Sequence, residues 1–291
     1  MKSRAALWWL FILFLVIAVL IGGGIWVVTT VKNAFAPGLS LGCTATVADQ
    51  QYSLALDQTE NAALISSIAI QRGMPARAAT IALATGMQES RLRNIDYGDL
   101  DSVGLFQQRP SQDWGTVEEI MDPVYSTNAF YDVLAKVPDY INMPINDAAQ
   151  IVQRSGFPYA YEQHEPLSRA FASALTGQSR EALNCTLPPV TSSSAPDIVI
   201  AAAQTAVGQV SATTAIDGAG TTVHFSVHEA YGWMLAHWAL ANANQFGISQ
   251  VSYDGQVWDR NSNADGHNKG WAPSSSTTAG QLTLVLPAAT P

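Results

Sequence analysis

Glu89 ends a stretch of the chain that carries no other ionisable side chain. No charged residue occurs between Arg77 and Glu89, and at helical spacing Ala82 and Thr85 share a face with the acid. A carboxyl group on such a face is partly removed from water, which disfavours its ionised form and raises its pKa. An acid that keeps its proton near neutral pH can donate it, so Glu89 is a candidate general acid.

A simpler interpretation makes Glu89 part of an ordinary surface ion pair. Arg93 lies four residues later, and an i, i+4 pair of this kind stabilises a helix by only about 0.2–0.5 kcal/mol. The stretch alone does not separate the two interpretations. The choice between them therefore rests on the motifs that follow.

Two short motifs after this stretch resemble those of soluble lytic transglycosylases, a family of the lysozyme-like superfamily. The first is Glu89-Ser90, and the second is the turn GLFQ, which begins at Gly104 and ends at Gln107. The resemblance implies that Glu89 is the catalytic acid and base. It also implies that Ser90, Gly104 and Gln107 shape a groove that holds the sugar chain.

Later residues extend this resemblance and then depart from it. The sequence MDP at 121–123 resembles the start of the next family helix, and Ala160-Tyr161 resembles the start of an Ala-Tyr-Asn motif. Glu162 stands where the family has Asn. Tyr161 is therefore a candidate substrate-binding residue on a partial motif, and the whole resemblance covers residues 49–183.

The resemblance implies cleavage of the MurNAc–GlcNAc bond of peptidoglycan by a lytic transglycosylase that uses Glu89 alone. One alternative is a lysozyme-type muramidase, which needs a second carboxylate about 5 Å away if retaining, or about 6.5–9.5 Å away if inverting. Asp99 and Asp101 lie in the polar loop after the helix and could supply it. A second alternative, of another class, is a non-catalytic wall-binding or scaffold protein.

Apolar periodicity and Gly or Pro breaks predict the helices that must position these residues. They cover residues 57–71, 123–137, 148–154 and 166–175, and the helix that carries Glu89 is predicted to begin near residues 75–78. The pattern predicts an all-α lysozyme-like domain over residues 48–187.

Residues 188–196 are rich in Pro and Ser and predict a linker to a small α+β domain at 197–291. Helical patterns at 197–207 and 231–246 precede a hairpin signal around Asp254-Gly255 and a strand at 282–286.

The C-terminal module resembles that of actinobacterial cell-wall proteins distantly similar to metal-dependent D-Ala-D-Ala carboxypeptidases. Its zinc ligands are not present, because the last strand is apolar where those enzymes have histidines. We expect capping or surface roles for the four histidines of the module, and neither a metal nor another cofactor. They are His224, His228, His237 and His267.

Residues 5–31 are uncharged and long enough, as a helix, to cross about 30 Å of hydrocarbon. Lys2 and Arg4 precede them, so we expect residues 1–31 to form a cytoplasmic tip and transmembrane anchor, residues 32–47 a stalk, and the rest to lie outside the cell. A cleaved signal peptide is the alternative. In that location Cys43 and Cys185 can form a disulfide.

The composition limits the partners of the chain. Its 291 residues are 48% hydrophobic, which is enough for a sizeable core, and the net charge is −9. A nucleic-acid-binding protein needs a basic face to neutralise phosphates, so this class is excluded. We expect peptidoglycan glycan strands as the partner, and the sequence predicts no particular protein partner.

Overall fold

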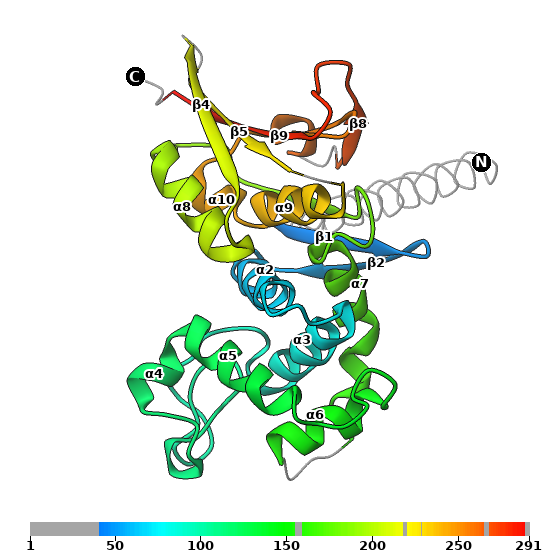
Figure 1. The fold of residues 1–291 in the computed structure, drawn as a ribbon, viewed down its shortest axis with the longest axis vertical. Coiled ribbons are helices and arrows are strands. Elements are labelled where there is room, and N and C mark those ends of the chain that lie inside the picture. The colour runs from blue at the N-terminus through cyan, green and yellow to red at the C-terminus, as the bar shows by residue number, and fades with distance from the viewer. Residues whose placement is uncertain (1–40, 155–158, 218–219, 228, 265–267, 289–291) are drawn as a thin grey trace, which may run out of the picture. The chain divides into compact units, whose positions relative to one another are not determined.

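The computed structural model describes residues 41–154, 159–217, 220–227, 229–264 and 268–288. Residues Leu41–Pro291 form one compact unit. Within the described residues, helices combine with two antiparallel sheets (Figure 1), one of three strands and one of six.

The first part of this unit is mostly helical. In chain order its elements are β1 (Gly42–Val47), β2 (Gln50–Leu54), α2 (Leu56–Gln71), α3 (Ala76–Ser90), η1 (Pro110–Gln112), α4 (Val117–Met121), α5 (Pro123–Leu134), α6 (Ile145–Gln153), η2 (Glu162–His164), α7 (Glu165–Leu175) and β3 (Leu183–Thr186). Helix α3 is its centre, and every residue from Ala78 to Gly86 is buried. Small side chains on α3 let α2 and α7 approach closely.

The prediction of an all-α domain is wrong, because three strands form a sheet in the order β2-β1-β3. These strands are short and contain few large apolar side chains, so their periodicity is weak in the sequence. Pairing between the two ends of the helical part forms the sheet. Residues 42–47, placed in the stalk from the sequence, are its central strand.

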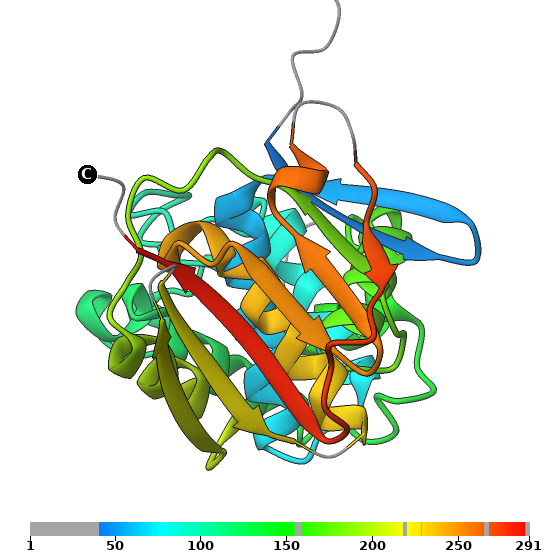
Figure 2. The same ribbon diagram turned by 90° about the horizontal axis from the view of Figure 1, so that it is seen from above.

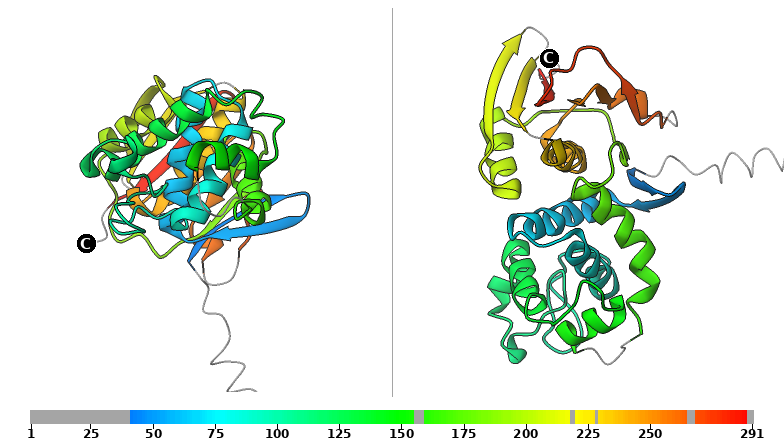
Figure 3. Two further views of the ribbon diagram at one scale, coloured as in Figure 1. Left: turned by 90° about the horizontal axis from the view of Figure 1, so that it is seen from below. Right: turned by 45° about the vertical axis from the view of Figure 1, so that its right-hand side comes forward.

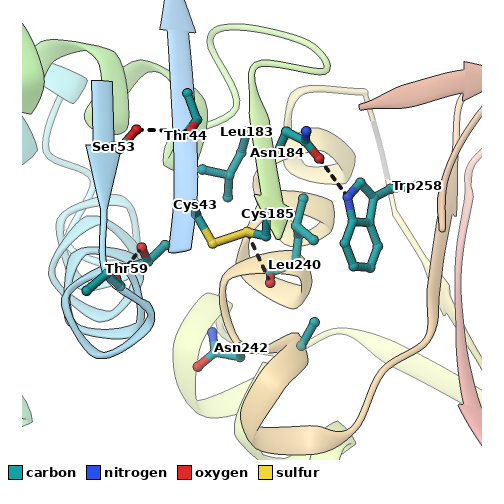
Figure 4. Close-up of a disulfide and its surroundings, with 12 residues drawn as sticks. Cys43, Thr44, Ser53, Thr59, Leu183, Asn184, Cys185, Leu240, Asn242 and Trp258 are labelled. Atoms are coloured by element: carbon teal, nitrogen blue, oxygen red, sulfur yellow. Dashed lines mark hydrogen bonds between the residues drawn. A yellow bond between two sulfur atoms is a disulfide. The ribbon is translucent and has the colours of Figure 1, made fainter. Parts of the chain in front are cut away.

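Cys43 and Cys185 form the disulfide that closes this sheet (Figure 4). The two residues lie directly opposite each other in the β1–β3 register. Both are buried, and the sulfur of Cys185 lies 3.8 Å from the carbonyl oxygen of Leu240. The bridge therefore joins the start and the end of the helical part beside a helix from the C-terminal part.

The C-terminal part places helices against one face of the six-stranded sheet (Figure 2). In chain order its elements are α8 (Pro196–Val207), β4 (Ser211–Asp217), β5 (Gly220–Ser226), α9 (Glu229–Ala241), α10 (Ala243–Phe246), β6 (Gln250–Tyr253), β7 (Gln256–Asp259), η3 (Asn261–Asn263), β8 (Trp271–Pro273) and β9 (Gln281–Pro287). The strand order is β4-β5-β9-β6-β7-β8. The predicted helix at 231–246 is two helices, because α9 ends at Ala241 and α10 begins at Ala243.

The helical part and the C-terminal part share one hydrophobic core. Helix α9 lies between the six-stranded sheet and the helices α2 and α7 (Figure 3). Two tryptophans of the sheet, Trp258 and Trp271, donate hydrogen bonds to Asn184 Oδ1 and to the carbonyl oxygen of Leu183, both at 2.8 Å. The predicted linker is itself fixed, since Arg260 Nη1 donates to the carbonyl oxygen of Pro188 at 2.6 Å.

The predicted membrane helix, residues 5–31, lies outside the described residues, as do His228 and His267. In the part of the chain that the structure describes, no helix is both long and apolar enough to cross a bilayer. The transmembrane part of the predicted fold therefore has no counterpart in the described structure, and the extracellular location stays a prediction.

His237 lies at the junction between the two parts. It is fully buried, and its Nδ1 donates to the carbonyl oxygen of Ala174 on α7 at 2.7 Å. Its Nε2 is buried without a hydrogen-bond partner among the described residues. Burial lowers the pKa of His237 from 6.5 to about 4, because a charged imidazolium would lose its hydration.

We predict that the free energy of unfolding falls as the pH is lowered from 6.5 to 4. In that window the unfolded chain binds a proton at His237 that the folded chain does not bind, so acid favours unfolding. At 1.36 kcal/mol per pKa unit the fall is on the order of 2–3 kcal/mol. Urea unfolding across this range measures it. His237→Asn keeps a hydrogen-bond donor and should make the free energy of unfolding depend less on pH in this range. His224→Asn, on β5, is the control and should leave that dependence unchanged. An equal dependence on pH in the two variants would contradict the role given to His237.

Candidate active site

Helix α3 brings Glu89 from the core to the surface in its last turn. The helix ends in two left-handed residues, Arg91 and Leu92, with φ of 55° and 56°. The N–H of Leu92 donates to the carbonyl oxygen of Gly86 at 2.9 Å, and the Leu92 side chain is fully buried. Non-glycine residues in this conformation carry strain of about 1 kcal/mol or more. The end of α3 is therefore held by tertiary packing, not by local preference.

Ser90 joins this helix end to the predicted groove-lining turn. Its hydroxyl donates to the carbonyl oxygen of Leu105 at 2.7 Å, and the N–H of Arg93 donates to the same hydroxyl at 3.2 Å. The turn is closed by two backbone hydrogen bonds between Val103 and Gln108, at 3.0 and 3.1 Å. Ser90 is buried, so its role in the structure is to position the turn.

Gly104 and Gln107 shape the turn from within. Gly104 has φ of +81°, and a Cβ atom there would lie 2.8 Å from the carbonyl oxygen of Ile120. Only glycine fits both demands. The Gln107 amide donates to the carbonyl oxygens of Tyr97 and Gly104, each at 3.3 Å. The structure thus places Gln107 against its own loop.

Glu89 receives two hydrogen bonds from side chains outside α3. The hydroxyl of Tyr161 donates to Glu89 Oε1 at 2.8 Å. The amide of Gln153, at the end of α6, also hydrogen-bonds Glu89 and donates to the carbonyl oxygen of Phe106 at 2.7 Å. Glu89 and Tyr161, two residues selected from motifs 72 positions apart, therefore meet in space.

Burial controls the ionisation of Glu89. Loss of hydration raises the pKa of Glu89 above its ordinary 4.5, against the lowering effects of the Tyr161 and Gln153 hydrogen bonds and of the Arg109 charge. The last turn of a helix also disfavours negative charge, because the carbonyl end of the helix dipole points there. The carboxyl group is therefore suited to hold a proton and release it.

Asn146 fixes Tyr161 in position. Its side-chain oxygen accepts from the N–H of Tyr161 at 3.1 Å and from the N–H of Glu162 at 2.8 Å. Its amide nitrogen donates to Glu162 Oε2 at 3.2 Å. Glu162, which departs from the Ala-Tyr-Asn pattern, is thus part of the contact that holds Tyr161. Sequence reasoning missed the roles of Asn146 and Gln153, because neither lies in a recognisable motif.

The two candidate second carboxylates are engaged elsewhere. Arg109 Nη2 binds Asp99 Oδ2 at 2.8 Å. The N–H and hydroxyl of Ser111 both donate to the carboxylate of Asp101 at 2.9 Å, and these bonds lower the pKa of that carboxyl group. Neither aspartate is hydrogen-bonded to Glu89. Arg109, which sequence reasoning did not select, pairs with Asp99, and its charge also lowers the pKa of Glu89.

A cavity of about 400 Å³ is lined in part by Gln153, one of the residues that act on Glu89. It is lined by the indole of Trp114, the aliphatic side chains of Val133 and Val152, and the amide of Gln153; Gln112, Asp113 and Arg154 complete it. Gln153 connects this cavity to the acid. An aromatic surface beside amide donors is the type of lining that binds uncharged polar rings.

Metal binding has no support in the described ranges, where no group of three His, Cys, Asp or Glu side chains could hold an ion. His224 is engaged with Thr283, its Nδ1 lying 3.0 Å from the threonine hydroxyl, and His237 is buried against α7.

The family model described as VldE, C-terminal domain, matches residues 192–281 of the chain. This segment begins just before α8 and ends at the first residue of β9, so it covers most of the C-terminal part. No curated protein matches the chain. The matched segment does not include Glu89, Tyr161 or the loop of Gln107.

We predict that Glu89→Gln stabilises the fold at neutral pH. The folded pKa of Glu89 is raised, so its ionised form costs stability once the pH rises above the unfolded value of 4.5 and through the folded pKa. The neutral amide of glutamine has the size of the carboxyl group and avoids the free-energy cost of a buried negative charge. The free energy of unfolding at pH 7.5 should rise, and the gain should vanish near pH 4, where the carboxyl group is protonated in both states. Exposed Glu118→Gln is the control; an equal gain there would refute the burial argument.

Proposed function

We propose that this chain cleaves the MurNAc–GlcNAc bond of peptidoglycan as a lytic transglycosylase, with Glu89 as the acid and base. The observation that carries the proposal is the environment of Glu89, a partly buried carboxyl group with a raised pKa that accepts a hydrogen bond from Tyr161. The resemblance of Glu89-Ser90 and of the turn ending at Gln107 to the transglycosylase motifs supplies the substrate class.

In the first step the protonated Glu89 donates its proton to the glycosidic oxygen. The bond between that oxygen and C1 of MurNAc breaks, and positive charge develops at C1. Glu89 becomes a carboxylate, and the Tyr161 hydroxyl bound to Oε1 at 2.8 Å stabilises the new charge. Arg109 adds a favourable field from a greater distance.

In the second step the 6-hydroxyl of the same MurNAc attacks C1. Its oxygen forms the new bond to C1, and its proton passes to the Glu89 carboxylate, which restores the acid. The product carries a 1,6-anhydro ring, and water is not consumed. One carboxyl group is sufficient for both proton transfers.

A muramidase is less well supported by the same contacts. A hydrolase of this type needs a second carboxylate to activate water or to bind C1. Asp99 is engaged by Arg109 and Asp101 by Ser111. A non-catalytic wall-binding role remains the alternative from another class, and the experiments below distinguish it.

Digestion of purified sacculi tests the proposal. The full-length chain should release 1,6-anhydromuramoyl products, detected by mass spectrometry. Glu89→Gln should lower the rate by at least about 100-fold, the contribution of a general acid, while its unfolding curve shows an intact fold. Asp99→Asn should keep activity of the same order.

Different results of the same digestion would support the muramidase or the wall-binding protein instead. Reducing MurNAc ends, together with a large loss in Asp99→Asn, would establish the muramidase. Binding to sacculi without any released product from the wild-type chain would establish the wall-binding role.

The pH profile of Tyr161→Phe tests how Glu89 is tuned. Removal of the hydroxyl removes a hydrogen bond that lowers the pKa of Glu89, so the pKa should rise. Because the acid must be protonated, the rate on soluble glycan strands at low concentration should fall at a higher pH than in the wild type. Exposed Tyr159→Phe is the control. A loss of rate with an unshifted profile would show that Tyr161 serves only to pack the site.

A further inference from the structure

A second cavity lies at the opposite end of α3 from Glu89. Its volume is about 410 Å³, and it is formed by the first turn of α3, the segment after α5, the middle of α7 and the turn after α7. Helices α3 and α7 lie side by side here (Figure 1). The lining residues are Ala76, Arg77, Thr80, Ile141, Arg169, Ser173 and Gln178. We call this cavity the arginine pocket.

The arginine pocket is cationic in a chain whose net charge is −9. Arg77 Nη1 and Arg169 Nη2 both bind the same oxygen of Glu165, Oε1, at 2.7 and 2.6 Å. One carboxylate thus serves two guanidinium groups, which leaves one positive charge uncompensated within this cluster. A single added negative charge would balance it.

The hydrogen-bond donors of the Arg77 side chain are also incompletely used. Arg77 Nη2 donates to the carbonyl oxygen of Met143 at 2.9 Å, but Arg77 Nε is buried without a hydrogen-bond partner among the described residues. A buried guanidinium donor left unpaired is costly. The first turn of α3 follows Pro75, which provides no side-chain cap, so the positive end of the helix dipole also points to this region.

Neutral groups complete the lining. Ser173 contributes a hydroxyl, which lies 2.7 Å from the Ser179 hydroxyl, and Gln178 contributes an exposed amide. Arg169 is mostly exposed, with 62% of its side chain accessible, so it can turn toward a ligand without disturbing the core. Planar guanidinium groups bind oxyanions through paired hydrogen bonds.

We propose that the arginine pocket binds a singly charged oxyanion group, either a carboxylate or a phosphodiester. The ligand oxygens accept from Arg77 and Arg169, and the hydroxyl and amide groups contact the remainder. This binding site is distinct from the Glu89 site, and the proposal does not depend on the proposed glycan cleavage.

Nitrogen-15 NMR of the arginine Nε–H groups of the full-length chain tests the proposal. Acetate is the carboxylate probe and dimethyl phosphate the phosphodiester probe, each titrated at constant ionic strength against sodium chloride. The Arg77 signal, assigned by its loss in Arg77→Lys, should shift along a saturable one-site curve with at least one probe. Saturation by only one of them identifies the source of the oxyanion.

Two variants make the result specific. Arg169→Gln should weaken the Kd at least fivefold, about 1 kcal/mol at 1.36 kcal/mol per tenfold. The matched control Arg93→Gln removes an exposed arginine that pairs with Asp57 elsewhere on the chain, and should leave the Kd unchanged. The proposal is overturned if neither probe shifts the Arg77 signal more than chloride does, or if Arg169→Gln and the control weaken binding equally.

Discussion

Partial burial of one carboxyl group is the constraint on which the proposed chemistry depends. Loss of hydration favours the protonated form of Glu89, whereas the Tyr161 hydroxyl, the Gln153 amide and the Arg109 charge favour the ionised form. An acid that acts again as a base needs both influences, since either one alone would stabilise a single protonation state. The pKa of Glu89 is therefore set by the balance between its burial and these three polar neighbours.

Several independent contacts hold the end of α3, and with it Glu89, in a fixed position. The helix is buried from Ala78 to Gly86, so its axis cannot shift without disturbing the core. Ser90 attaches the groove turn to the helix, and Asn146 attaches the segment of Tyr161 to α6. The left-handed residues after Ser90 carry local strain that this packing must offset.

Local patterns in the sequence predicted most of the helices and selected Glu89 as a candidate acid, but they did not predict the contacts between distant segments. The helix that carries Glu89 is predicted to begin near residues 75–78 and begins at Ala76, because proline and apolar periodicity act locally. Strands β1 and β3 could not be found in this way, since their stability comes from a register that pairs Cys43 with Cys185. The role of Gln153 was equally hidden, because an amide at a helix end has no sequence signature. Ser90 was selected by its motif, yet the structure gives it a positioning role that the motif does not reveal.

The common core between α7 and α9 has an evolutionary consequence. Helix α9 and the two sheet tryptophans cover apolar surface of the helical part. Trp258 donates to the side chain of Asn184, and Trp271 donates to the carbonyl oxygen of Leu183. Deletion of the segment that matches the VldE C-terminal domain would expose that surface to water. Selection for any function of the helical part, including the proposed glycan cleavage, would therefore retain the C-terminal residues even if they bound no ligand. Their conservation in descendants of this chain would not by itself show that they have a separate function.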